Sequence, residues 1–305
     1  MKNTFKALPK AEREKVRTVY IQYLKERNGK PDFEAHTSAL RDEFFRVLDS
    51  NPTLVSARGR LNQEVFTRNQ RRGSPEPGLD RRTLWAVCAA NANLTEDYGV
   101  KYGFEVKPMK DPEYPYSWVQ IEENYHTRLL ADCVRTLGVQ MEIIPPKLGT
   151  RMLLNVLVQL PYYFSNILIL CAEAIGLVVF KGLQLKAREL FADEPEALKR
   201  IDSLFDQIII DEIGHVRWVH SQMGQFRLSF TRAIIPWIAR AFLRDLPDVV
   251  ELLGKDWIMS EVRKTAETGI IVMDDGRVHP LDVMLGNAKG ESRQLQSLMT
   301  LAPAA

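Results

Sequence analysis

The sequence has few of the features that place a chain in a specialised class. Only three cysteines occur in 305 residues, Cys88, Cys133 and Cys171, and their spacing matches neither a disulfide framework nor a zinc site. We therefore interpret them as small core residues in a reducing cytoplasm. Residues 1–6 lack the apolar run of a signal peptide, and no glycine-rich phosphate-binding loop is present.

Strand-like alternation and net charge are also scarce. Residues 268–279 are the one stretch typical of a small hairpin, around Asp274-Asp275-Gly276. The formal net charge of +2 gives no argument for a nucleic-acid partner, and we expect none. A composition of 45% hydrophobic and 26% charged residues is typical of a soluble globular chain.

Helical periodicity fills most of the remaining sequence, so we predict an all-α fold. The expected helices span about 10–27, 32–49, 59–70, 80–98, 116–138, 149–191, 195–225 and 229–253. We expect a single domain over 1–305. It comprises an N-terminal helical layer (1–72), a four-helix bundle (79–225), and a C-terminal helix with a small hairpin and tail (226–305).

One apolar segment, 152–180, is long enough to be mistaken for a transmembrane helix. It carries polar or helix-breaking residues that lipid would not readily tolerate: Asn155, Gln159, Pro161, Ser165, Asn166 and Glu173. We therefore predict no membrane span, and instead a buried central helix that is kinked or broken at Pro161.

Two short motifs carry the chemistry. Residues 122–126 read Glu-Glu-Asn-Tyr-His and residues 211–215 read Asp-Glu-Ile-Gly-His, so each contains an acid followed by Glu-x-x-His. Residues three apart share a helix face, so each motif directs one carboxylate and one imidazole to the same point. Four-helix bundles hold two iron or manganese ions with two such pairs and one Glu from each remaining helix. The sequence therefore predicts a dinuclear metal site.

A third carboxylate comes from Glu173, the only charge in a long apolar stretch. An unpaired buried charge is costly, and a bound metal ion would offset that cost. The midpoint between Glu173 and Glu212 lies beside Asp193, which can cap a helix, and near Pro195, which suits a first helical turn. An antiparallel hairpin turning there would place Glu173 opposite Glu212.

The fourth carboxylate should lie on the helix before Glu123, which we expect Gly99 to end. Glu96 is the only Glu on that helix, and it precedes the next loop by about as much as Glu123 follows it. We choose Glu96. Asp97 beside it and the more distant Glu64 stay open as alternatives.

These motifs resemble those of the ferritin-like diiron carboxylate superfamily over about residues 80–225. The order of acids and Glu-x-x-His pairs is similar to its oxygen-activating branch of acyl-carrier-protein desaturases, bacterial monooxygenase hydroxylases and arylamine N-oxygenases. Residues 122–126 are closest to the Glu-Glu-Asn-x-His motif of the soluble desaturases. Arylamine N-oxygenases carry an extra histidine where this sequence has Ile208, so that subgroup fits less well.

The resemblance implies a ferritin-like four-helix bundle with additional N- and C-terminal helices, binding two Fe ions or an Fe/Mn pair. The implied metal ligands are Glu96, Glu123, His126, Glu173, Glu212 and His215. Glu123 and Glu212 would bridge the ions and act in catalysis with Glu173, whose binding mode would shift as O2 enters. Asp211 and Glu122 are candidates to accept the second N–H of the ligand histidines.

The implied function is that of a non-haem diiron oxygenase or oxidase, with O2 as co-substrate. It would hydroxylate, desaturate or N-oxidise an organic substrate that is apolar or bound to a carrier protein, with electrons from a ferredoxin or a flavin reductase. Ferritin-type iron oxidation and storage is one alternative, although such chains are usually shorter. A radical protein resembling ribonucleotide reductase is another, with Tyr125, Tyr162 or Tyr163 as the radical site. A homodimer is one option for the assembly.

A substrate pocket is expected beside the metals. The crossover between 139 and 152, the N-terminal layer and the helix over 231–254 should enclose it. Its apolar lining would include Leu168, Ile169, Ile208 and Ile209.

Overall fold

The computed structural model describes residues 3–269 and 278–287, and within them the chain is predominantly helical, as predicted. The core of the expected hairpin, around Asp274, lies outside these residues. The helices are α1 (Lys10–Asn28), α2 (Ala39–Ser50), α3 (Gln63–Arg72), α4 (Arg81–Val106), α5 (Pro115–Thr136), α6 (Leu148–Gln159), α7 (Tyr162–Leu190), α8 (Pro195–Ser221), α9 (Gln225–Asp245), α10 (Pro247–Leu253), α11 (Lys255–Thr268) and α12 (Pro280–Met284). Two short antiparallel strands, β1 (Pro31–Asp32) and β2 (Thr37–Ser38), precede α2.

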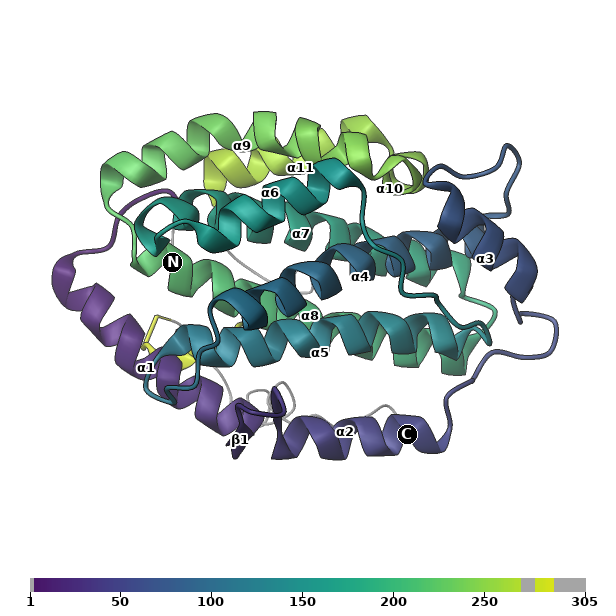
Figure 1. The fold of residues 1–305 in the computed structure, drawn as a ribbon, viewed down its shortest axis with the longest axis horizontal. Coiled ribbons are helices and arrows are strands. Elements are labelled where there is room, and N and C mark those ends of the chain that lie inside the picture. The colour runs from purple at the N-terminus through teal and green to yellow at the C-terminus, as the bar shows by residue number, and fades with distance from the viewer. Residues whose placement is uncertain (1–2, 270–277, 288–305) are drawn as a thin grey trace.

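Four long helices form the centre of the molecule (Figure 1). Helix α4 packs against α5 and α7, and α8 packs against α7 and α5. Asp80 caps α4, because its carboxylate accepts hydrogen bonds from the backbone N–H groups of Arg82 and Thr83. Pro115 and Pro195 lie in the first turns of α5 and α8, where a missing N–H costs nothing.

Two layers enclose this four-helix core from opposite sides (Figure 1). On one side α1 packs against α5 and α8, with α2 beside α1. On the other side α6 packs against α4 and α7, while α9 and α11 cover α7. The C-terminal helix α12 packs against α1, so the last described segment lies on the N-terminal side of the core.

Helix α7 is apolar enough to meet the length and composition criteria for crossing a membrane, but 56% of its most apolar window is buried inside the protein. It packs along α8 in the core, which is consistent with a soluble protein. The chain breaks between α6 and α7 at Pro161, as predicted. Pro195 begins α8 as predicted, but Asp193 does not cap it: Glu194 holds the N-cap position, and Asp193 pairs with Arg82 instead.

Residues 32–38 are not helical, contrary to the expected helix over 32–49. The Asp32 side chain accepts hydrogen bonds from the backbone N–H groups of Glu34 and Ala35, which fixes a turn. The backbone N–H of Ser38 donates to the hydroxyl oxygen of Tyr125 at 2.7 Å, so α5 holds this segment in place. Helix α2 begins only after that contact.

We expected Gly99 to end α4, but the helix continues to Val106. Gly99 faces α6, and a β-carbon there would lie 3.6 Å from the side chain of Leu154. That is an ordinary van der Waals distance, so the packing there does not require a glycine. The sequence-based assignment also missed α11, which packs against α9 and α7.

Candidate metal centre

Side chains from all four central helices meet at one buried cluster. Helix α4 supplies Glu96, α5 supplies Glu123 and His126, α7 supplies Glu173, and α8 supplies Glu212 and His215. Potential ligand atoms of the first set, Glu96, Glu123, His126 and Glu212, lie within 4.8 Å of one another. The same limit holds for the second set, Glu123, Glu173, Glu212 and His215. The two sets share Glu123 and Glu212, so the cluster has the composition of two adjoining sites.

Several oxygen and nitrogen atoms of this cluster that could bind a metal have no hydrogen-bond partner within the described protein. They are Glu96 Oε2, Glu212 Oε2, His215 Nδ1 and both ring nitrogens of His126, and all five are buried. Leaving a buried polar group unsatisfied costs about 1–3 kcal/mol. Carboxylate oxygens and imidazole nitrogens are ligands for iron, manganese and zinc, so these residues fit a bound metal ion that would satisfy the orphaned atoms.

The spacing around the histidines is compact. The Nδ1 atom of His215 lies 2.9 Å from Glu123 Oε1 and 3.7 Å from Glu173 Oε2. The Nδ1 atom of His126 lies 3.3 Å from Glu212 Oε1. Both imidazoles therefore direct the same ring nitrogen toward the carboxylates.

The other ring nitrogen of each histidine contacts an acid from the opposite motif. His215 Nε2 lies 3.1 Å from Glu122 Oε2, and His126 Nε2 lies 3.4 Å from Asp211 Oδ2. Both acids are fully buried. At His215 the Glu122 carboxylate can accept from Nε2–H, which fixes the imidazole tautomer and leaves the Nδ1 lone pair directed at the cluster. At His126 the Asp211 carboxylate faces Nε2 as a charged neighbour without a hydrogen bond. The two candidate acids thus lie where they can orient the histidines, in a crosswise arrangement.

A further layer from α1 and α2 supports these acids. Asp211 pairs with Arg27 and accepts a hydrogen bond from Arg41 at 2.8 Å. Glu122 accepts a hydrogen bond from the Asn28 side chain at 2.9 Å, and Asn28 in turn accepts one from Arg41 at 2.9 Å. Sequence reasoning missed all three residues, because no motif links them to helices that follow far along the chain.

Burial and mutual repulsion change the acidity of the cluster. Burial, together with the charges of Glu123 and Glu173, raises the pKa of Glu96 to about 8 against the opposing effect of the histidines. Burial also raises the pKa of Glu212 well above its usual value. For His126, burial lowers the pKa, but the surrounding carboxylates outweigh it and raise the pKa well above normal. The metal-free cluster therefore holds protons at neutral pH.

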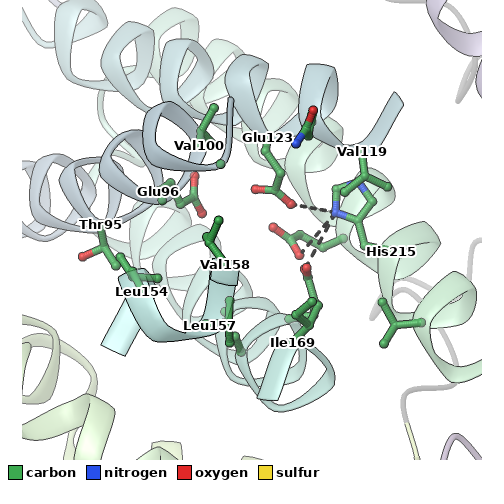
Figure 2. Close-up of a pocket in the computed structure, with 18 of the residues that line it drawn as sticks. Thr95, Glu96, Val100, Val119, Glu123, Leu154, Leu157, Val158, Ile169 and His215 are labelled. Atoms are coloured by element: carbon green, nitrogen blue, oxygen red, sulfur yellow. Dashed lines mark ion pairs between the residues drawn. The ribbon is translucent and has the colours of Figure 1, made fainter. Parts of the chain in front are cut away.

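An apolar cavity of about 300 Å³ adjoins the cluster. Figure 2 shows Leu154, Leu157 and Val158 facing Glu96 across it. Glu123, whose side chain is 21% exposed, lines this cavity together with His215, whereas His126 does not and is fully buried. The cavity therefore reaches the carboxylate side of the cluster.

The lining differs in part from the expectation. Ile169 lines the cavity as expected, but Leu168 does not, nor do Ile208 and Ile209, which are buried in the core. Among the described residues the N-terminal layer contributes nothing to the lining, because it packs behind the histidines. Helix α6 forms the outer wall instead, with Phe242 of α9 and Leu246 beyond it.

The competing acids lie elsewhere. Asp97 pairs with Lys101 at 2.8 Å on the outside of α4, and Glu64 lies on α3 away from the cluster.

Of the three tyrosines named as radical sites, Tyr163 is 61% exposed and Tyr125 bonds to the β2 segment. Only Tyr162 lines the cavity.

Comparisons with known proteins identify no relative. No family model matches the chain, and no curated protein or solved structure matches it. The described chain is predominantly helical and has a buried carboxylate and histidine cluster that could hold a metal ion.

Proposed function

We propose that this chain is a ferritin-like, non-haem diiron oxygenase or oxidase that uses O2 to hydroxylate, desaturate or N-oxidise an apolar organic substrate. The observation that carries the proposal is the position of the cluster, which lies in the wall of an apolar cavity. Mostly apolar cavities of a few hundred Å³ with a few polar groups are typical of small-molecule sites.

The charges of the cluster support two divalent ions. Six buried or half-buried carboxylates converge here: Glu96, Glu122, Glu123, Glu173, Asp211 and Glu212. Arg27 and Arg41 are the guanidinium groups that face them. With both histidines neutral as ligands, four negative charges remain, and two divalent cations would neutralise them. Uncompensated buried charge is strongly unfavourable, so the metal-loaded state suits this interior.

The two ligand sets suggest how the residues divide the ions. Glu123 and Glu212 belong to both sets and are the bridging candidates. Glu96 and His126 would complete the coordination of one ion, and Glu173 and His215 would complete that of the other. Carboxylate-rich ligation suits iron and manganese, and ferrous iron bound there would reduce O2.

The protein itself performs the positioning. Glu122 and Asp211 hold the two imidazoles in a fixed orientation, so the ligand nitrogens are preorganised. The cavity excludes water and presents an apolar substrate to the side of the cluster formed by Glu123 and Glu173. A storage protein needs a polar path for iron, whereas the lining here is predominantly apolar, which favours an organic substrate.

Metal analysis and O2 uptake test the proposal. We expect roughly two iron or manganese ions per chain, and ferrous protein should consume roughly one O2 per metal pair and then stop until it is reduced again. Glu173→Ala and His215→Ala should each lower the metal content or abolish O2 uptake. Glu189→Ala is the matched control, because Glu189 lies on the same helix as Glu173 but is exposed and pairs only with Lys186 among the described contacts.

Two results would overturn the proposal. If both variants keep full metal content and O2 uptake, the cluster is not the metal site. If aerobic titration with ferrous salt continues far beyond two ions and mineral absorbance grows, iron storage replaces the oxygenase.

A further inference from the structure

An exposed apolar surface lies on the far side of the cavity wall. Of the thirteen exposed large hydrophobic side chains in the described chain, nine lie within residues 143–164 or on α9. We define the α6–α9 face by six of them: Leu148, Met152, Val156, Phe226, Phe230 and Trp237. Their exposed fractions reach 85% at Phe226 and 70% at Trp237. Soluble proteins rarely leave a large contiguous apolar patch without a binding role.

Hydrogen bonds connect α9 to the start of α6 and to the first turn of α7, which follows α6 in the chain. Near the start of α6, Thr150 donates to the Asp245 carboxylate at 2.8 Å and Lys147 donates to the Asp245 backbone carbonyl at 3.2 Å. Beyond the end of α6, Arg227 of α9 donates to the backbone carbonyl of Tyr163 of α7 at 2.9 Å. Helices α6 and α9 therefore run side by side in opposite directions (Figure 1).

The charges on this face are almost all positive. Residues 143–164 contain no acid, and α9 contains only Asp245, which accepts the hydrogen bond from Thr150. Six cations lie on the same two segments, namely Lys147, Arg151, Arg227, Arg232, Arg240 and Arg244. The whole chain has a formal net charge of only +2, so positive charge is concentrated here. Arg240 lies over the Trp237 ring at 5.1 Å, so cationic and aromatic groups alternate along α9.

We propose that the α6–α9 face binds the surface of an anionic lipid bilayer. Interfacial helices combine aromatic and aliphatic side chains, which enter the headgroup boundary, with Lys and Arg, which attract anionic lipids. Six cations against one acid on the two segments also disfavour pairing of this face with a second copy of itself, because like charges would then face each other. The binding is peripheral, because α7, the helix apolar enough to span, is largely buried in the core.

The face is one helix away from the cavity. Leu154, Leu157 and Val158 of α6 line the cavity, whereas Met152 and Val156 of the same helix are exposed. A bilayer bound to this face would therefore lie directly outside the cavity wall. The binding itself does not depend on the metal chemistry, so each can be tested without the other.

Co-sedimentation of the full chain with vesicles tests the proposal. We expect binding to vesicles of phosphatidylcholine with phosphatidylglycerol, weaker binding to phosphatidylcholine alone, and weakening by salt. Phe226→Ser with Trp237→Ser should abolish binding. Arg232→Gln with Arg244→Gln should weaken it roughly 25-fold, at roughly fivefold per arginine. Leu40→Ser with Val47→Ser is the matched control, because these exposed residues lie on α2 across the molecule.

Tryptophan fluorescence locates the contact. Trp85, Trp118 and Trp218 are fully buried and Trp257 of α11 is partly buried, whereas Trp237 is exposed, so a blue shift on adding anionic vesicles should come mainly from Trp237. The conservative Trp237→Phe should remove most of the shift and retain sedimentation.

Three outcomes would overturn the proposal: no binding to anionic vesicles, equal binding to neutral vesicles with no effect of the arginines, or binding that the α2 control also loses. A fourth is a dimer in solution that Phe226→Ser with Trp237→Ser converts to monomers, since the face is then a self-association interface.

Discussion

Each histidine of the cluster is oriented by the acid that precedes the ligand Glu of the other motif. Successive residues on an α-helix are rotated by about 100°, so Asp211 cannot face the same way as Glu212. Glu212 turns into the cluster, and Asp211 reaches across to His126 on α5. Glu122 reaches His215 on α8 in the same way. In each motif, therefore, one acid faces the cluster and the acid beside it contacts the histidine on the other helix.

The assignment of Glu96 can be tested by single substitutions on α4. Glu96→Ala should lower the metal content toward one ion per chain, because it removes the only cluster acid that α4 supplies. Asp97→Ala should leave the metal content unchanged, since Asp97 pairs with the exposed Lys101. Metal content of purified protein, measured by mass spectrometry, distinguishes them. The opposite pattern would replace Glu96 by Asp97 and leave the rest of the cluster in place.

At the scale of whole elements, periodicity predicted the helices that carry the motifs but not what surrounds them. The three-residue spacing and the hairpin symmetry about Asp193 were enough to bring Glu173 opposite Glu212. The predicted end of α4 at Gly99 and the helix predicted over 32–38 were wrong, and the contact of Ser38 with Tyr125 decided the second. Long-range pairs of this kind leave no local pattern in a sequence.

Arg27 of α1 and Arg41 of α2 form such long-range pairs with Asp211, and removing either arginine should lower the stability of the fold. Arg27→Met would leave Asp211 buried with one cation fewer, and breaking a buried ion pair costs about 3–5 kcal/mol. Urea unfolding of the metal-free protein measures this loss. Lys25→Met on the same helix is the control, and we expect little change because its ion pair with Glu113 is exposed. Equal stability of the two variants would show that α1 is not held through Asp211.

At the scale of the whole molecule, the cluster couples stability to pH. Folded metal-free protein holds a proton on Glu96 up to about pH 8, whereas an unperturbed Glu releases it near 4.5. The folded state therefore binds more protons in this window, and the resulting stabilisation is lost as pH rises through about 8. His126 and His215 have raised pKa values and act in the same direction. Metal ions replace these protons.

We therefore expect the melting temperature of metal-free protein to fall between about pH 6 and about pH 8.5, while that of metal-loaded protein changes less. Scanning calorimetry with and without a chelator measures both. Glu96→Gln should reduce the pH dependence of the metal-free protein, because it removes one of the titrating groups. A melting temperature that rises across this window without metal would contradict the raised pKa of Glu96.

The sharing of Glu212 by both ligand sets has a consequence for the order of assembly during synthesis. Glu96, Glu123 and His126 leave the ribosome early, but neither set is complete until α8 emerges, several seconds later at about 5–20 residues per second. A metal ion that needs either complete set would therefore bind only after α8 has docked against the earlier helices.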